Sequence, residues 1–268
     1  MRAYITLLSN EKYYNGVVML HRSLVDVKSK YPLYCMLSAT VDESLEVGLK
    51  NEGVSCIRLQ KSVVDRGVNE EGQTFSHWSH TFDKLQTWGL TQFEKLIFVD
   101  SDMLVRRNID SLFEKPAFTA VCAGYSYPTN HDWFGLNSGL LVIEPDKQVE
   151  ESLFRLFPNV IDEFVSKNKS VGDQDVINRY ISDWHLKKEL HLDEGYNLFA
   201  EYLSYYVRHN GYSWSGRKGK DIVVVHFIGR QKPWMKKSIR SWAWFIRESI
   251  RNPYYLLAYL KYISYLKR

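Results

Sequence analysis

The sequence contains few cysteines. Its 268 residues include only Cys35, Cys56 and Cys122, each in a short apolar context. Because three is an odd number, no disulfide framework is indicated. Buried free thiols are typical of proteins in a reducing compartment, so we expect these three side chains to be reduced.

Long hydrophobic runs are absent as well. No stretch approaches the roughly 18 consecutive apolar residues that a membrane-spanning helix needs. The first apolar segment, residues 3–8, has no basic segment and apolar h-region ahead of it, so no signal peptide is predicted. We therefore expect a cytoplasmic location, peripheral at the inner face of the cytoplasmic membrane.

Acidic residues are scarce only near the end of the sequence. Residues 230–268 contain ten Lys or Arg and a single acid, Glu248, which leaves 25 basic and 30 acidic residues in 1–229. Trp and Tyr alternate with the cations after residue 235, a pattern that favours an anionic membrane surface. We expect one or two interfacial helices broken near Pro253; the alternative is that these aromatics pack on the rest of the protein. No nucleic-acid-binding motif accompanies the basic residues, so nucleic acid is not an expected partner.

Short apolar segments alternate with helical patterns through most of the sequence, without an internal repeat or a linker before residue 230. This alternation predicts an α/β domain of the nucleotide-binding type. Strands are expected at residues 3–8, 33–37, 55–59, 95–99, 120–124, 140–143 and 222–225, and helices at 13–27, 43–51, 79–88, 148–166 and 173–182. Residues 60–78 are expected to form a long loop, and the aromatic segment 125–135 a loop that lines a site.

The apolar run at residues 96–99 ends abruptly in two carboxylates, Asp100 and Asp102. So short a run predicts a strand buried on both faces. Ligands of open α/β sheets bind beyond the carboxyl ends of the strands, so both side chains should lie at a cleft. Oxygen donors at positions i and i+2 suit magnesium or manganese, although a solvated turn at the end of a strand explains the pair equally well.

A histidine, His226, directly follows the apolar run 222–225. If the two strands are neighbours, Asp100, Asp102 and His226 converge on one metal ion. The alternative is a histidine that is hydrogen-bonded at the end of a strand. Gly229 allows a close backbone approach to a diphosphate and Lys232 supplies a cation, with Lys84 as a second one.

Several segments resemble the family 8 retaining glycosyltransferases, most closely the glycogenin branch. The matching segments are residues 6–10 with Tyr13, 82–93, 100–102, 108–113, 136–142, 172–175 and 226–234. The resemblance implies a single Rossmann-like domain of the glycosyltransferase A type over residues 1–235, with a mixed, mainly parallel sheet. A basic, aromatic helical segment would follow at residues 236–268.

The resemblance also implies a role for each matching residue. A UDP-sugar donor would be held by Leu7, Ser9, Asn10, Tyr13, Lys84, Asp100, Ser101, Asp102, Asn137, Ser138, Asn197, Gly229 and Lys232. Asp100, Asp102 and His226 would bind Mn²⁺, with Mg²⁺ as the alternative ion, and the metal would take up charge on the departing UDP. Asp173, Gln174 and Asp175 are the expected catalytic residues. Asp173 or Asp175 would act in a double displacement; otherwise the acceptor attacks from the side of the leaving phosphate.

Two departures from the glycogenin pattern bear on the acceptor. Ser204 stands where glycogenins have the tyrosine that receives the first glucose, although Tyr202, Tyr205 and Tyr206 are close by. Phe75 replaces an arginine, for which Arg66 or His77 is a candidate substitute.

We therefore expect a metal-dependent transferase that moves a hexose from a UDP-sugar to a glycan acceptor. The expected acceptor is a lipid-linked bacterial surface polysaccharide or lipopolysaccharide. A self-glucosylating primer of the glycogenin kind and a non-catalytic sugar-nucleotide-binding module are the alternatives, and a homo-oligomer stays open.

Overall fold

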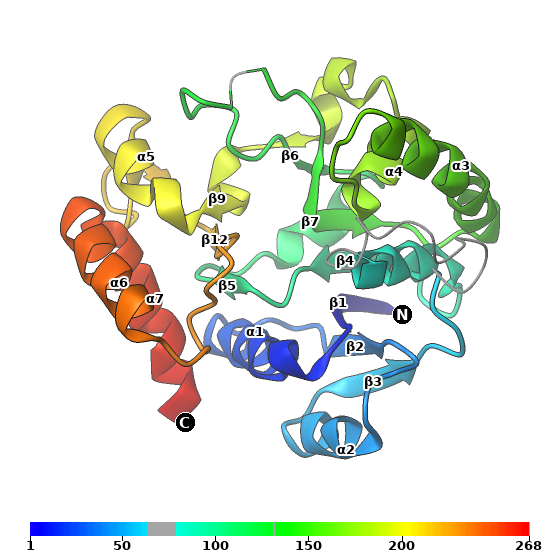
Figure 1. Ribbon diagram of the computed structural model, residues 1–268, viewed down its shortest axis with the longest axis horizontal. Coiled ribbons are helices and arrows are strands. Elements are labelled where there is room, and N and C mark those ends of the chain that lie inside the picture. Colours follow the sequence, from blue (N-terminus) through cyan, green and yellow to red (C-terminus); the bar gives the residue numbers. More distant parts are fainter. Residues whose placement is uncertain (64–78, 131, 268) are drawn as a thin grey trace.

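The central element of the fold is a mixed β-sheet (Figure 1). The computed structural model describes residues 1–63, 79–130 and 132–267. Within them the sheet has seven strands: β3 (Ser55–Arg58), β2 (Leu33–Leu37), β1 (Arg2–Leu8), β4 (Lys95–Val99), β7 (Asn137–Ile143), β6 (Ala120–Val121) and β8 (His191–Leu192), in that spatial order. The first four run parallel, and β7 is antiparallel to β4 and β6. The predicted mixed, mainly parallel sheet is confirmed.

The strand directions bring three chain segments to one edge of this sheet. β1 and β4 are parallel neighbours, so their carboxyl ends lie side by side. β7 runs the opposite way and begins at this edge, where the amide of Asp100 donates to the carbonyl of Gly139 at 2.8 Å. The residues after β4 and the first residues of β7 therefore face each other.

A smaller sheet joins this edge to the C-terminal part of the chain. It consists of β5 (Met103–Val105), β12 (Val224–His226) and β9 (Leu198–Phe199), with β12 in the middle. The last strand was predicted at 222–225, but β12 begins later and includes His226. The reason is pairing on both sides, since His226 lies opposite Met103 of β5 and Phe199 of β9. A separate parallel pair is formed by β10 (Tyr212–Ser213) and β11 (Lys220–Asp221).

Helices cover both faces of the central sheet. The α-helices are α1 (Tyr14–Asp26), α2 (Glu43–Asn51), α3 (Lys147–Ser166), α4 (Asp173–Tyr180), α5 (Leu203–His209), α6 (Ile239–Arg251) and α7 (Pro253–Ser264). Short 3₁₀ helices are η1 (Glu11–Tyr13), η4 (Ser79–Gly89), η5 (Asp110–Glu114), η6 (Trp184–Leu186), η7 (Lys188–Leu190), η8 (Glu194–Tyr196), η9 (Ala200–Tyr202) and η10 (Tyr265–Lys267). Asp42 and Asp146 cap α2 and α3 by accepting backbone N–H bonds, which explains why these helices begin where they do.

The hydrophobic core has two parts because successive side chains of a strand point to opposite faces. Tyr4 of β1 packs with α1, α2 and α7, whereas its neighbour Ile5 packs with η4, α3 and α4. Both residues are fully buried. The catalytic edge predicted from the sequence is thus supported by packed helices on both sides.

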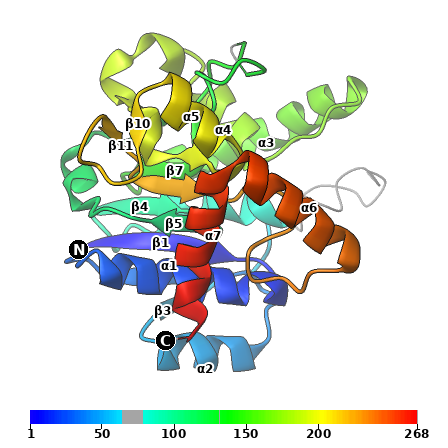
Figure 2. The same ribbon diagram turned by 90° about the vertical axis from the view of Figure 1, so that its left-hand side faces the viewer.

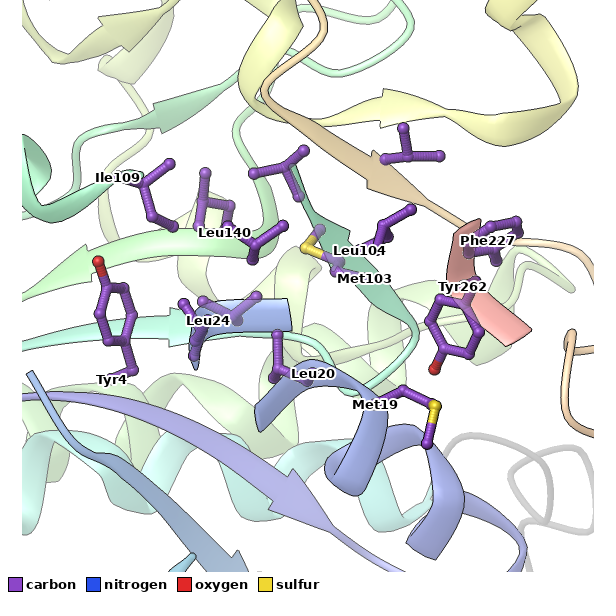
Figure 3. Packing of buried hydrophobic residues seen from close by; sticks show 14 of the residues in the cluster. Tyr4, Met19, Leu20, Leu24, Met103, Leu104, Ile109, Leu140, Phe227 and Tyr262 are labelled. Atoms are coloured by element: carbon purple, nitrogen blue, oxygen red, sulfur yellow. The ribbon is translucent and has the colours of Figure 1, made fainter. Parts of the chain in front are cut away.

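The two C-terminal helices differ in what they do with their apolar residues. α7 buries Tyr255, Tyr259 and Tyr262 in the core, and the rings of Tyr262 and Phe227 pack edge to face at 5.1 Å (Figure 3). α6 and α7 meet at an angle (Figure 2). The break between the helices falls at Pro253, as predicted. Of the described helices, none combines the length and the hydropathy that crossing a membrane requires.

Candidate active site

The acidic turn after β4 meets the end of β12 at the sheet edge. Asp100, Asp102 and His226 each offer one ligand atom, and these atoms lie within 4.8 Å of one another. His226 Nε2 is 3.2 Å from Asp102 Oδ1 and 3.8 Å from Asp100 Oδ2. The structure therefore brings together the three residues that the sequence proposed as metal ligands.

The surroundings of His226 prepare it to bind a metal ion. Its Nδ1 lies 3.0 Å from Asn197 Oδ1, and Asn197 Nδ2 donates to Asn137 Oδ1 at 2.7 Å. The second bond orients the Asn197 amide, so its oxygen faces the imidazole and places the ring proton on Nδ1. Nε2 faces the two carboxylates, where it would act as the nitrogen ligand of a bound metal ion. Two carboxylates and one oriented imidazole fit a divalent cation such as manganese or magnesium.

Two buried lysines flank the three ligands. Lys84 Nζ lies 3.0 Å from both Asp100 Oδ1 and Asp173 Oδ2. Lys232 Nζ donates to Asp102 Oδ2 at 2.7 Å. Burial alone would lower the pKa of each lysine, but the neighbouring carboxylates outweigh it and raise both pKa values. Both lysines are therefore cations at neutral pH.

Asp102 carries the opposite charge in the same network. Burial works to raise its pKa, but His226 and Lys232 outweigh burial and hold the pKa of Asp102 well below its usual value. The carboxylate is thus ionised throughout the neutral range, as a metal ligand must be.

A polar wall begins at the start of β7 and continues onto α4. Asn137 Nδ2 donates to Gln174 Oε1 at 2.9 Å, and Ser138 Oγ donates to Asp173 Oδ2 at 2.7 Å. Lys84 joins this wall to the metal ligands through Asp100 and Asp173. Asp175 is not part of it: its carboxylate accepts from the amide of Gly172 at 2.8 Å and closes the first turn of α4. Asp175 instead lines a separate cavity of about 300 Å³ beside Trp133 and Phe134.

The residues predicted to hold uridine lie at the carboxyl end of β1. They are Leu7, Ser9, Asn10 and Tyr13. Tyr13 packs edge to face with Trp234 at 5.9 Å between ring centres, and Trp234 Nε1 donates to the carbonyl of Lys12 at 2.7 Å. The segment after β12 therefore closes over the start of α1, next to the metal ligands.

One glycine permits the close approach of α1 to the acidic turn. A Cβ atom on Gly16 would lie 2.7 Å from the carbonyl oxygen of Ser101 and 2.9 Å from the Trp234 ring. Real Cβ atoms do not come so close to a backbone oxygen. A side chain at position 16 would push the helix away from Ser101, which is itself buried.

A sequence profile described as Glycosyl transferase family 8 matches residues 4–238. The chain belongs to glycosyltransferase family 8. This membership confirms the family predicted from the motifs. Family 8 enzymes use UDP-sugar donors and a divalent metal ion, and they retain the anomeric configuration.

The chain is similar to curated proteins with different names. Glycogenin-1 of Caenorhabditis elegans is 31% identical over 237 residues, which are 87% of this chain and 50% of the nematode protein. UDP-glucuronate:xylan alpha-glucuronosyltransferase 2 of Arabidopsis thaliana is 27% identical over 237 residues, 87% of this chain and 35% of the plant protein. The chain thus spans about half or less of these relatives.

A solved structure resembles this chain over nearly its whole length. Galactosyltransferase LgtC, solved with donor and acceptor sugar analogues, matches with a TM-score of 0.61 at 15% identity. The match covers 94% of this chain and 96% of LgtC. At this identity the likeness concerns the fold, and it confirms the predicted glycosyltransferase A type.

Two residues that the family 8 motifs did not indicate lie next to the site. The amide of Gly229 donates to Glu201 Oε1 at 3.1 Å, so Gly229 contacts a carboxylate in the predicted phosphate-binding segment. Asn252, between α6 and α7, donates to the carbonyl of Glu201 at 2.9 Å. No local pattern announces either residue, because both are brought in by packing of distant segments.

The residue at the position of the glycogenin acceptor tyrosine is buried in this chain. Ser204 is 5% exposed, and its hydroxyl donates to Asn252 Oδ1 at 2.7 Å. Tyr206 is buried as well and donates to Glu194, whereas Tyr202 and Tyr205 are partly exposed. The departure at Phe75 and its candidate substitutes, Arg66 and His77, lie outside the described residues.

Proposed function

We propose that the protein is a metal-dependent, retaining glycosyltransferase that moves a hexose from a UDP-sugar to a glycan acceptor. The observation that carries this proposal is the convergence of Asp100, Asp102 and His226 between the cations of Lys84 and Lys232. A non-catalytic binding module has no need for such an arrangement of ligands and cations around one point.

The donor's diphosphate is the group that this arrangement suits. A divalent ion held by Asp100, Asp102 and His226 supplies positive charge for the phosphate oxygens. Lys232 and Lys84 are preorganised cations beside the ligands, so they stabilise the charge that develops on the departing UDP. Manganese is the ion we propose, since imidazole together with carboxylates suits it better than it suits magnesium.

The transferred hexose would lie against the polar wall at the start of β7. Asn137, Ser138 and Gln174 offer amide and hydroxyl groups to sugar hydroxyls, and Asn197 links this wall to the metal ligand His226. If the reaction proceeds by double displacement, Asp173 is the carboxylate that the hydrogen bonds connect to the site. Asp175 closes the first turn of α4, which favours a supporting role for it.

The experiment that tests the function is UDP release from a panel of UDP-sugars by the purified protein with Mn²⁺. Asp102→Ala removes one metal ligand and the partner of Lys232, so we expect release to fall about a hundredfold or more. Asp162→Ala, on the exposed side of α3, is the matched control and should keep full activity. Equal release by the Asp102 variant and the native protein would contradict a metal-dependent transfer.

A lipid-linked bacterial surface glycan is the acceptor we propose, on the evidence of α6. Ile239, Trp242, Ile246 and Ile250 follow one another on one side of this helix and are 90, 48, 56 and 77% exposed. The same helix carries Arg240, Arg247 and Arg251, and Lys236 and Lys237 lie just before it. An apolar stripe bordered by cations is typical of a helix that lies in the surface of an anionic membrane. This pattern supports a location at the inner face of the cytoplasmic membrane, where lipid-linked acceptors are available.

Self-glucosylation is the alternative that Ser204 argues against. A buried hydroxyl bonded to Asn252 cannot act as an acceptor without local unfolding. Intact mass after incubation with UDP-glucose would reveal self-glucosylation as added hexose units, and we expect the mass to stay unchanged.

A further inference from the structure

A carboxylate from η9 contacts the segment around Gly229, which the sequence predicts to bind the donor's diphosphate. Glu201 lies in η9, and its Oε1 accepts the backbone N–H of Gly229 at 3.1 Å. The residue is partly exposed, but among the described residues its other oxygen, Oε2, is buried and has no hydrogen-bond partner. A buried carboxylate oxygen without a partner is costly, so its presence calls for a reason.

The backbone holds Glu201 firmly in this position. Asn252 Nδ2 donates to the carbonyl of Glu201 at 2.9 Å and to the carbonyl of Ala200 at 3.1 Å. Asn252 itself is 3% exposed and caps α7. The 3₁₀ turn that carries Glu201 is therefore fixed to the C-terminal helices, and its side chain cannot withdraw far from Gly229.

Each group that would bind the diphosphate already contacts a carboxylate. Lys232 Nζ lies 2.7 Å from Asp102 Oδ2, and the Gly229 amide is bonded to Glu201. Glu201 is also within electrostatic reach of His226 and Lys232, and burial raises its pKa despite these two neighbours. A diphosphate that binds here must replace Glu201 as the acceptor of the Gly229 N–H. Its negative charge then lies beside the carboxylate of Glu201.

We propose that Glu201 is a release residue: it holds the Gly229 amide when no donor is bound, and it opposes the diphosphate so that UDP leaves after transfer. No covalent bond changes in this exchange; the Gly229 N–H passes from Glu201 Oε1 to a phosphate oxygen and returns when UDP departs. The inference rests on the proposed function, because it takes the segment around Gly229 to bind the diphosphate of the donor.

A supporting role for Glu201 would have the opposite signature. If Glu201 merely positioned the Gly229 amide for the donor, its loss would weaken the binding of UDP. If it competes with the diphosphate, removal of its charge strengthens the binding of UDP and leaves the binding of uridine unchanged, since uridine has no phosphate. The direction in which the affinity for UDP changes therefore distinguishes the two roles.

The test is calorimetric titration of UDP and of uridine, with Mn²⁺, into native protein and Glu201→Gln. Glutamine keeps the carbonyl oxygen that accepts from Gly229 but lacks the charge. We expect the Kd for UDP to fall about fivefold or more, because like charges in a partly buried site repel strongly, and the Kd for uridine to stay constant. If the release of UDP limits turnover, tighter binding of UDP should also lower kcat.

Two variants make the comparison specific. Glu194→Gln removes another partly buried carboxylate, one that accepts from the Tyr206 hydroxyl away from Gly229, and should leave the Kd for UDP unchanged. Glu201→Asp keeps the charge, so its Kd for UDP should stay close to the native value.

Three results would overturn the proposal. Unchanged or weaker binding of UDP by folded Glu201→Gln would refute the role of Glu201 alone. An equal gain in affinity by Glu194→Gln would mean that the effect is not local to Gly229. Failure of the native protein to bind UDP would refute the proposed function and this inference with it.

Discussion

Replacing Asn252 with alanine should unfold the protein more readily, because this one side chain joins three segments. Its Nδ2 donates to the carbonyls of Ala200 and Glu201, at 3.1 and 2.9 Å. Its Oδ1 accepts from the amide and hydroxyl of Ser204 at 3.2 and 2.7 Å, and from the amide of Tyr255 at 3.0 Å. Alanine therefore removes five hydrogen bonds, although the Tyr255 amide keeps the backbone carbonyl of residue 252 and the Ala200 carbonyl keeps the amide of Leu203.

The size of the effect follows from the number and burial of these groups. An unsatisfied buried polar group costs about 1–3 kcal/mol, but such costs are not additive and water relieves part of them. The loss of the α7 cap alone is worth about 1 kcal/mol. We expect Asn252→Ala to lower the free energy of unfolding by about 3–5 kcal/mol, a large fraction of the roughly 5–15 kcal/mol of a typical domain.

Urea denaturation followed by tryptophan fluorescence measures this change. Asn51→Ala, at the exposed end of α2, is the control and should shift the free energy of unfolding by no more than about 0.5 kcal/mol. A loss below about 1 kcal/mol in Asn252→Ala would refute the view that this residue fixes the C-terminal helices to η9. The transition must be a single step for the comparison to hold.

Three other perturbations give further tests. Gly16→Ala should reduce UDP release about tenfold or more, because its Cβ would lie 2.7 Å from a backbone oxygen of the acidic turn, whereas Gly48→Ala, which meets the side chain of Tyr14 and no backbone atom, should keep activity. Burial raises the pKa of Cys122 to about 11, so iodoacetamide should label it at pH 8 roughly a hundredfold more slowly than a free cysteine and faster as the pH rises; equal rates would contradict its burial. Replacing Trp242 and Ile246 with alanine should weaken sedimentation with phosphatidylglycerol vesicles at least tenfold while leaving UDP release in solution unchanged; unaltered sedimentation would remove α6 as the membrane contact.

The sequence was sufficient to predict that Asp100, Asp102 and His226 lie together, because the signal of each is local. A short apolar run that ends in Asp100 and Asp102 predicts both the strand and its exposed end, and His226 follows a run of the same kind. Neither Glu201 in η9 nor the helix cap at Asn252 has such a signal in the sequence. Their burial depends on how α6 and α7 fold back, which periodicity within one segment does not determine.

The C-terminal segment shows the same limit. Its aromatic residues all looked alike in the sequence, but Tyr259 and Tyr262 of α7 are buried in the core, whereas Trp242 of α6 is exposed. For the same reason, deletion of residues 236–268 would remove part of the core together with the proposed membrane contact. Substitutions on α6 are the cleaner way to test that contact.

The packing of α1 against the end of the chain has a consequence for biosynthesis. η10 contacts α1, and Arg22 donates to the carbonyl of Tyr265, so a segment synthesised 243 residues after Arg22 completes the core around α1. At about 5–20 residues per second, the chain between the acidic turn and α7 takes roughly 10–30 s to synthesise. During that time the part of α1 that η10 covers is still exposed, so this surface is the last of the α1 core to be buried as the protein is made.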